Sequence, residues 1–234
     1  MLRDPQRPFG VPADATEILL ARHGSAGAAE DGRPPALVGG HTDPPLAPRG
    51  HAQARALAAR LAPAGLAAIF VSTLRRTAET AEPLAAALGL QPVVVPELRE
   101  VFLGDWEGGE FAVRMANADP TIAEVFRRQR WDVIPGAEPA DAFAARVRRG
   151  LDLVADAIGA GAAGLAIAHG GVVAEACRQA TGSEPFAFIN VDNASISRLV
   201  RLASRRWVLL SFNDTAHLAE VAAEVPVGGV REAG

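Results

Sequence analysis

Short apolar runs alternate with helical patterns along most of the chain, and this alternation constrains the fold more than any other feature of the sequence. The three clearest runs are residues 16–21 (TEILLA), 66–71 (LAAIFV) and 164–168 (GLAIA). Each run is too short for a buried helix, and apolar residues at helical spacing follow it. Strands that alternate with helices predict an α/β fold, and we expect a three-layer α/β/α sandwich around a mostly parallel central sheet.

The remaining segments fit a single domain over residues 1–234, which suits a chain of this length. Further elements are expected as helices over 49–61, 72–88, 141–158 and 170–181, a short strand over 92–95, and two late strands over 195–201 and 206–212. Ser72 is the expected N-cap of the second helix. We expect an irregular arm over residues 1–15, a long loop of functional type over 25–48, and a helical insertion over the active site at about 104–140.

Composition excludes several classes of chemistry and of partner. The formal net charge is −4 and the isoelectric point is about 5.8, so we expect neither nucleic acid nor a membrane as a partner. All 23 basic residues are arginine and tyrosine is absent, which excludes a lysine Schiff base, a P-loop lysine and a tyrosine nucleophile. Cys177 is the one cysteine, so an internal disulfide and a multi-cysteine metal site are excluded. A single thiol is compatible with a reducing compartment, and we expect a cytoplasmic protein.

Polar side chains stand where the expected strands end. The segments are Arg22-His23-Gly24, Ser72 to Arg76, Glu97 to Glu100, and His169-Gly170-Gly171. Ligands bind beyond the carboxyl ends of the strands in an open α/β sheet, so we expect these side chains to meet at one edge of the sheet. The glycines after each histidine let the backbone turn tightly and let a ligand approach closely. The sequence therefore predicts a site with two histidines, at least two arginines and a carboxylate.

This mixture of side chains favours phosphate chemistry. Guanidinium groups donate paired hydrogen bonds to tetrahedral oxyanions and keep their charge. A neutral imidazole can attack phosphorus, a second imidazole can donate to the phosphoryl oxygens, and a carboxylic acid can protonate the leaving oxygen. Two histidines and a carboxylate could instead bind zinc, but the charges of Arg22 and Arg76 oppose a metal, so we expect neither metal nor cofactor. Each residue alone is better explained as a solvated or packed side chain, and only their joint occurrence favours a site.

The same residues belong to an ordered series of motifs. The segments are 19–24 (LLARHG), 40–46 (GHTDPPL), 72–81 (STLRRTAETA), 98–108 (LREVFLGDWEG), 135–138 (PGAE) and 168–171 (AHGG). The series resembles the RHG-containing motifs of the histidine phosphatase superfamily, which includes the phosphoglycerate-mutase-like enzymes, and it extends over about residues 17–218. The RHG triplet alone is a weak signal, whereas the whole ordered series is specific. The resemblance implies a phosphoglycerate-mutase-like fold.

The resemblance also implies a role for each residue at a matching position. His23 is implied as the phosphorylated nucleophile, and Glu100 as the proton donor to the leaving group and then the base for water. The catalytic residues that we expect are His23, Glu100, Arg22, Arg76 and His169. The substrate-binding residues that we expect are Arg22, Gly24, Ser25, Arg76, His169 and Gly170. The motif spacing selects Arg76 over Arg75, whose side chain points about 100° away on a helix and is expected on the surface.

The function that we expect is hydrolysis of a phosphomonoester, without a metal and through a phosphohistidine intermediate, with a small phosphorylated metabolite as substrate. The first alternative is a cofactor-dependent phosphoglycerate mutase, although Ser25 stands where such mutases carry glutamate and the lysines that they use are absent. The second is a non-catalytic protein that binds a phosphorylated ligand. Dimers occur in the family, so a homodimer stays open.

Several residues have no assigned chemistry. Four arginines of the expected insertion either grip an anionic substrate or form a solvated helix face, and the second interpretation is favoured; they are Arg114, Arg127, Arg128 and Arg130. His41 is a candidate for the mouth of the pocket, whereas His217 is taken as structural. Trp106 is expected either in the pocket wall or in the core.

Overall fold

A computed structural model describes residues 10–27 and 34–223 and contains a six-stranded sheet. Its strands are β1 (Thr16–Arg22), β4 (Ile69–Val71), β5 (Val93–Val94), β6 (Ala163–Ala168), β7 (Ile196–Arg201) and β8 (Trp207–Asp214). Their order across the sheet is β5-β4-β6-β1-β7-β8. The first four are parallel and the last two run antiparallel to their neighbours, which confirms the mostly parallel sheet.

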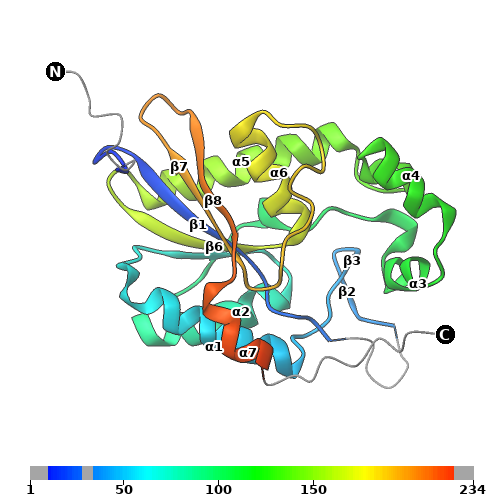
Figure 1. Cartoon of the computed structure of the whole chain (residues 1–234), viewed down its shortest axis with the longest axis horizontal. Helices are drawn as coiled ribbons and strands as arrows, with labels where there is room; N and C mark the ends of the chain where they lie inside the picture. Colours follow the sequence, from blue (N-terminus) through cyan, green and yellow to red (C-terminus); the bar gives the residue numbers. More distant parts are fainter. Residues whose placement is uncertain (1–9, 28–33, 224–234) are drawn as a thin grey trace.

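Helices cover both faces of this sheet. The α-helices are α1 (Pro48–Leu61), α2 (Arg75–Leu88), α3 (Glu110–Ala116), α4 (Pro120–Arg128), α5 (Ala140–Ile158), α6 (Gly170–Thr181) and α7 (Ala219–Ala223). Short 3₁₀ turns occupy Ala62–Ala64, Pro96–Leu98, Gly104–Trp106, Trp131–Val133 and Ala216–Leu218. Helices α1 and α2 lie on one face and α5 and α6 on the other, so the three-layer sandwich is confirmed (Figure 1).

Strand β1 shows how the sequence pattern produces two cores. Ile18 and Leu20 are buried in the cluster that includes residues of α5 and α6. Leu19 and Ala21 belong to the cluster that includes residues of α1 and α2. Successive side chains of a strand point to opposite faces, so a continuous apolar run is what a strand buried on both faces requires.

Two local expectations need correction. Helix α2 begins at Arg75 after an extended Leu74, so Ser72 is not its N-cap. Ser72 Oγ instead accepts the N–H of Leu74 and contacts His169, because the chain makes one further turn between the strand and the helix. The expected loop over residues 25–48 contains a short antiparallel hairpin of β2 (Leu37–Val38) and β3 (His41–Thr42).

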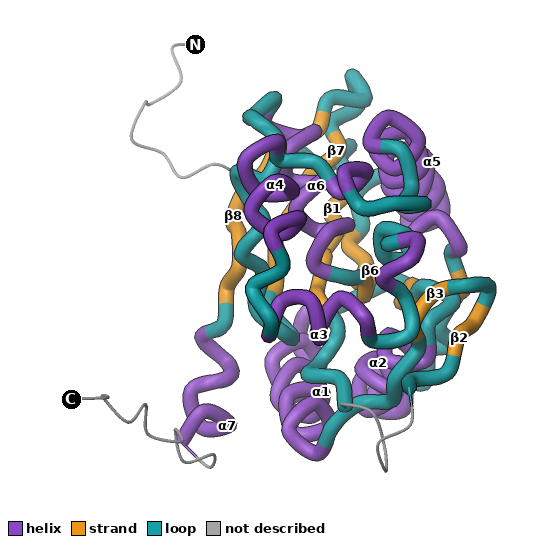
Figure 2. The backbone as a smooth tube through the Cα atoms, turned by 90° about the vertical axis from the view of Figure 1, so that its right-hand side faces the viewer, coloured by secondary structure: helices purple, strands orange, loops and turns teal. Residues whose placement is uncertain are grey.

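The arrangement of the strands creates one natural ligand site. Strands β4, β6 and β1 are neighbours, and the helices that follow β1 and β6 lie on opposite faces of the sheet. Where the connections from two adjacent parallel strands leave toward opposite faces of the sheet, a crevice forms beyond the carboxyl ends of those strands. Helices α3 and α4 stand in front of this end of the sheet, with the β2–β3 hairpin beside them (Figure 2).

Two further expectations concern the N-terminal arm and the number of domains. Residues 1–9 of the expected arm lie outside the described residues, and residues 10–15 form no helix or strand. That the whole chain is one domain stays a prediction. None of the described helices has the length and apolar character needed to cross a membrane.

Candidate active site

Strand register brings the two predicted histidines together. Arg22 pairs with Ala168, and the N–H of His23 donates to the Ala168 carbonyl at 3.0 Å. His23 and His169 therefore follow adjacent strands at the same level of the sheet. Their ring centroids are 5.1 Å apart, and their exposed fractions are 7% and 0%.

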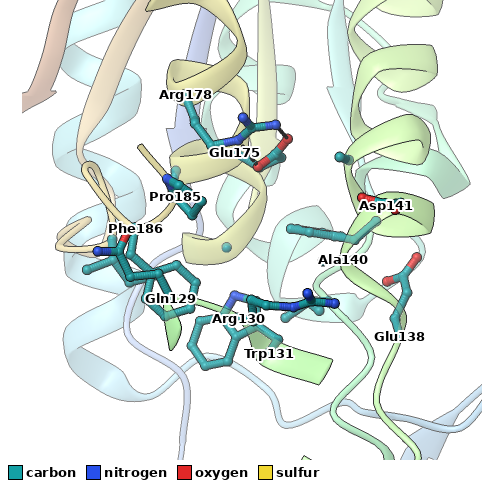
Figure 3. A pocket seen from close by; sticks show the side chains of 16 residues that line it. Gln129, Arg130, Trp131, Glu138, Ala140, Asp141, Glu175, Arg178, Pro185 and Phe186 are labelled. Atoms are coloured by element: carbon teal, nitrogen blue, oxygen red, sulfur yellow. Dashed lines mark hydrogen bonds and ion pairs between the residues drawn. The ribbon is translucent and has the colours of Figure 1, made fainter. Parts of the chain in front are cut away.

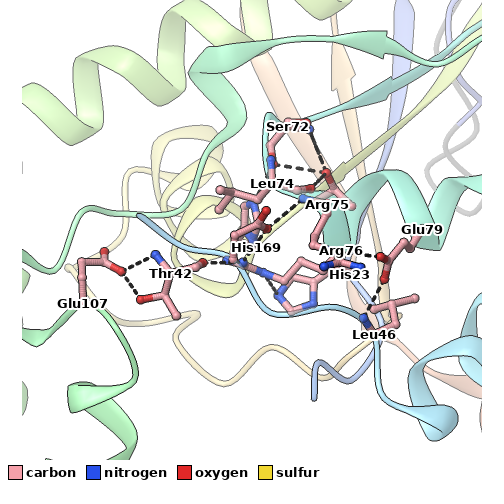
Figure 4. Close-up of polar contacts among 12 residues, drawn as sticks. His23, Thr42, Leu46, Ser72, Leu74, Arg75, Arg76, Glu79, Glu107 and His169 are labelled. Carbon is pink, nitrogen blue, oxygen red and sulfur yellow. Dashed lines mark hydrogen bonds and ion pairs between the residues drawn. The ribbon is translucent and has the colours of Figure 1, made fainter. Parts of the chain in front are cut away.

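The hydrogen bonds of His23 define its tautomer. Nδ1 lies 2.7 Å from the carbonyl oxygen of Gly24, and a carbonyl can only accept, so Nδ1 carries the proton. Nε2 lies 3.2 Å from Nε of Arg76, and a guanidinium can only donate, so Nε2 is an acceptor (Figure 4). Both contacts agree on a neutral ring whose lone pair is on Nε2.

The electrostatic surroundings keep both rings neutral. Burial lowers the pKa of His23 well below its ordinary value, and the charges of Arg76 and Arg22 lower it further. Burial is also the largest cause that lowers the pKa of His169, followed by the charge of Arg76. A neutral imidazole is the form that can act as a nucleophile.

Two arginines stand beside the histidines. Arg76, in the first turn of α2, donates from Nε to His23 and from Nη1 to the Thr42 carbonyl at 2.8 Å. Arg22 donates from Nη1 to the Val191 carbonyl, and its Nε is buried without a partner among the described residues. Burial lowers the pKa of both guanidiniums, although an arginine keeps its charge in the physiological range.

Glu100 reaches the same edge from the loop after β5. Its Oε2 accepts the N–H of Gly171 at 3.2 Å, and its Oε1 accepts the N–H of Val101 at 2.9 Å. A Cβ atom at position 171 would lie 2.6 Å from Oε1, so only glycine leaves room for this carboxylate. The negative charge of Glu100 acts on both Arg22 and Arg76. All five predicted catalytic side chains thus meet at one end of the sheet.

The remaining predicted binding residues make their observed contacts through the backbone. The N–H of Gly24 donates to Thr80 Oγ1 at 3.0 Å, and the N–H of Ser25 donates to Gln53 Oε1 at 2.8 Å. Gly24 also faces Gly50 so closely that a Cβ would lie 2.6 Å from the Gly50 oxygen. These contacts hold the segment after β1 against both α1 and α2, and contact of Gly24 and Ser25 with substrate stays a prediction. Gly170 begins α6 next to the side chain of Arg22.

The sequence did not predict the hydrogen bond that holds the ring of His169 in place. Ser72 Oγ lies 2.8 Å from His169 Nε2, and Nδ1 is buried without a partner in the described part of the chain (Figure 4). Ser72 therefore fixes the ring and leaves Nδ1 for a ligand. The serine was visible in the STLRR motif, but its place before a helix suggested a cap instead.

Sequence reasoning also missed a link between the hairpin and the expected insertion. Glu107 accepts the N–H of Thr42 at 2.7 Å and also accepts its hydroxyl (Figure 4). The other carboxylate oxygen of Glu107 accepts the N–H of Leu103 at 3.0 Å. Because the Thr42 carbonyl accepts from Arg76, this link also orients the guanidinium.

Other residues lie largely as expected. Arg75 is half exposed and pairs with Glu79, whereas Arg76 is 7% exposed. The four arginines of the 104–140 segment pair with nearby carboxylates on the surface, as a solvated helix face requires; the pairs are Arg114 with Glu110 and Asp119, Arg127 and Arg128 with Glu124, and Arg130 with Asp132. Trp106 is both core and pocket wall. His217 contacts the Ala194 carbonyl at 3.0 Å.

Two cavities flank Val101. The first, which we call the leaving-group pocket, has a volume of about 400 Å³ and includes Arg76 and Glu100 in its lining. The second, of about 270 Å³, lies between the α4–α5 connection and α6, with Trp131 and Phe186 in its wall (Figure 3). The second cavity includes none of the five predicted catalytic side chains, so the first is the one joined to the chemistry.

The described residues contain no group of three or more His, Cys, Asp or Glu side chains that could hold a metal ion. Positive charge at the site comes instead from Arg22 and Arg76. Buried neutral imidazoles beside guanidiniums suit the capture of a phosphate group. Enzymes that act on phosphate esters are the class that this fold and this site indicate.

Comparison with known proteins gives the family. The family model described as histidine phosphatase superfamily (branch 1) matches residues 18–215. Because the match covers most of the chain, the protein belongs to the histidine phosphatase superfamily.

Individual relatives differ in the activity that their names state. The chain is 36% identical over 146 residues to the "Bifunctional protein Rv2228c" of Mycobacterium tuberculosis, a match that covers 62% of this chain and only 39% of the relative. It is 30% identical to the "Probable phosphoglycerate mutase GpmB" of Yersinia enterocolitica, covering 86% of this chain and 94% of the relative. The structure of mycobacterial glucosyl-3-phosphoglycerate phosphatase Rv2419c is similar with a TM-score of 0.67 and 28% identity, covering 86% of this chain and 100% of that one.

Proposed function

We propose that the protein hydrolyses phosphomonoesters of small metabolites without a metal ion, through a phosphohistidine at His23. The observation that carries the proposal is the acceptor Nε2 of a buried, neutral His23 beside the guanidinium of Arg76. A lone pair held next to fixed positive charge is what attack on an anionic phosphoryl group needs.

The first step transfers the phosphoryl group to the enzyme. His23 Nε2 forms the bond to phosphorus while the bond from phosphorus to the ester oxygen breaks. Arg22, Arg76 and His169 bind the phosphoryl oxygens. A phosphate oxygen only accepts, so His169 donates from Nδ1 while the Ser72 hydroxyl donates to Nε2. The leaving alcohol takes its proton from the carboxyl group of Glu100.

The second step releases inorganic phosphate. Glu100, now a carboxylate, takes a proton from water as the water oxygen bonds to phosphorus. The bond from phosphorus to His23 Nε2 breaks, and the imidazole returns to its neutral form. The two guanidiniums supply the positive charge that a metal ion supplies in other phosphatases. The cytoplasmic location and the homodimer stay predictions from the sequence.

The test is phosphate release from a panel of phosphometabolites and p-nitrophenyl phosphate in the presence of EDTA. Wild type should release phosphate, and His23→Ala should not. His51→Ala is the matched control, because His51 is exposed on α1 and takes no part in the hydrogen bonds of the five catalytic side chains. Undiminished release by the His23 variant would end the proposal, and loss of release with EDTA would end its metal-free part.

A mutase is the second candidate because the Yersinia relative carries that name. A mutase must bind a second anionic group of its substrate. Among the described residues that line the leaving-group pocket, Arg76 is the single arginine, which favours hydrolysis. Conversion of 3-phosphoglycerate that depends on added bisphosphoglycerate would establish the mutase instead. Tight phosphate binding without turnover would point to the non-catalytic alternative.

A further inference from the structure

The leaving-group pocket is mostly apolar, although it shares two side chains with the candidate catalytic site. Its lining includes side chains of Leu103, Trp106, Phe111 and Val113 together with the catalytic Arg76 and Glu100. At about 400 Å³ it falls in the size range of small-molecule sites. We propose, on the basis of the proposed function, that the preferred substrates are phosphomonoesters of alcohols that carry an apolar, ring-sized group, and that a second anionic group on the alcohol makes a substrate worse.

The charges of the pocket argue against a second anion. Arg76 is the single arginine among the described residues that line it, and its Nε and Nη1 already face His23 and the Thr42 carbonyl. Glu107 also lines the pocket and adds negative charge there. A carboxylate on the leaving alcohol would therefore lose water without gaining a guanidinium partner, which is costly in an apolar site.

Arg114 does not supply the missing cation. Its guanidinium pairs with Glu110 at 2.6 Å and with Asp119 at 2.8 Å. It stands 5.9 Å from the ring centroid of Trp106 but is not among the residues that line the pocket. Two carboxylates thus already neutralise this arginine.

The apolar wall of the pocket matches a ring in size and in chemistry. The rings of Trp106 and Phe111 pack at a tilt of 48° with a centroid distance of 6.2 Å; Trp106 is buried in a core cluster, and Phe111 packs against that cluster. Val113, two residues after Phe111 in α3, also lines the pocket and is 50% exposed. Burying this exposed apolar surface against a substrate ring is favourable by the hydrophobic effect. Because Glu100, the proposed proton donor to the leaving alcohol, lines this pocket, we assign its apolar wall to the alcohol.

The test compares three esters of primary alcohols, so that intrinsic leaving-group reactivity is similar: 2-phenylethyl phosphate, ethyl phosphate and phosphoserine. We expect kcat/KM for 2-phenylethyl phosphate to exceed that for ethyl phosphate by at least about tenfold, since even one buried methylene gives 10- to 200-fold. Phosphoserine should be the poorest of the three. Equal or faster turnover of phosphoserine, with phosphate release still dependent on His23, would overturn this inference and leave the proposed function intact. No turnover of any ester would overturn both.

A pair of variants on α3 tests whether the pocket sets the preference. Val113→Arg places a guanidinium at the apolar wall, so the ratio of kcat/KM for 2-phenylethyl phosphate to that for phosphoserine should fall by about tenfold or more. Met115→Arg is the matched control, because Met115 is 44% exposed on the same helix and does not line the pocket. The control should keep the wild-type ratio. An unchanged ratio in Val113→Arg, or an equal change in both variants, would overturn the assignment of the pocket.

Discussion

Replacing Gly171 by alanine should displace the proton donor without harming the fold. The new Cβ would lie 2.6 Å from Glu100 Oε1, whereas comfortable contacts begin at about 3.5 Å, so the carboxylate must move by about 1 Å. The bond from the Gly171 N–H to Oε2, 3.2 Å long, is lost or distorted by the same movement. Misplacement of a reacting group by 1 Å costs about 100-fold in rate, or about 2.7 kcal/mol of transition-state stabilisation.

The assay measures kcat/KM, which reports the transfer to His23, with two esters. A poor leaving group such as 2-phenylethanol needs the proton of Glu100, so its ester should lose about 100-fold in Gly171→Ala. The ester of p-nitrophenol needs no such proton and should lose far less. The melting temperature should not fall, because alanine favours a helix over glycine by about 1 kcal/mol and the displaced atom is the end of a flexible side chain.

The neighbouring position provides the contrast. A Cβ at Gly170 would lie 3.6 Å from Arg22 Nε, which is an ordinary contact, so Gly170→Ala should lose much less activity than Gly171→Ala. Equal losses for the two esters in Gly171→Ala, or full activity with the alkyl ester, would refute the role of Glu100 as the proton donor.

Three further predictions follow from the site. Arg76→Ala should lower kcat/KM by about 100- to 1000-fold, while Arg75→Ala stays near wild type, because only the guanidinium of Arg76 reaches His23. Steady-state kinetics that show an equal loss of kcat/KM in the two variants would contradict this. Ser72→Ala should lower kcat about tenfold with little change in KM by freeing the ring of His169, and an unchanged kcat would count against it. Both buried histidines have a lowered pKa, so the unfolded chain binds their protons first as pH falls below about 6.5. Urea unfolding should therefore show stability lost between pH 6.5 and 5.5, by up to about 2 kcal/mol for the two histidines together, and a flat profile there would contradict the neutral histidines.

The sequence predicted the sheet because its central strands are buried on both faces. The runs 16–21 and 164–168 are continuous and apolar, and such runs have few alternative structures in an α/β chain. The edge strand β5 is only Val93–Val94, and the hairpin within residues 25–48 was not predicted. Two-residue pairings depend on tertiary contacts, here those of Thr42 with Glu107, that no local pattern contains.

The five catalytic candidates could be chosen from strand ends and motifs, but their mutual support could not. That Nε2 of His23 is the acceptor depends on the Gly24 carbonyl and on Arg76, which only folding brings to opposite sides of the ring. The role of Ser72 was mistaken for a cap, because a serine before a helix has the same local pattern in both cases. The apolar wall at Val113 was also invisible, since the helical pattern does not tell which exposed face borders a cavity.

The central claim is that phosphate passes through Nε2 of His23. The most direct measurement uses Glu100→Gln with p-nitrophenyl phosphate, where the phosphoryl group can reach His23 without an acid but leaves slowly without a base. We predict a burst of p-nitrophenol equal to the amount of enzyme, and a phosphoryl group on the peptide that contains His23, labile to acid and stable to alkali. The same burst in a Glu100→Gln, His23→Gln double variant, or a phosphoryl group on any other residue, would contradict the account.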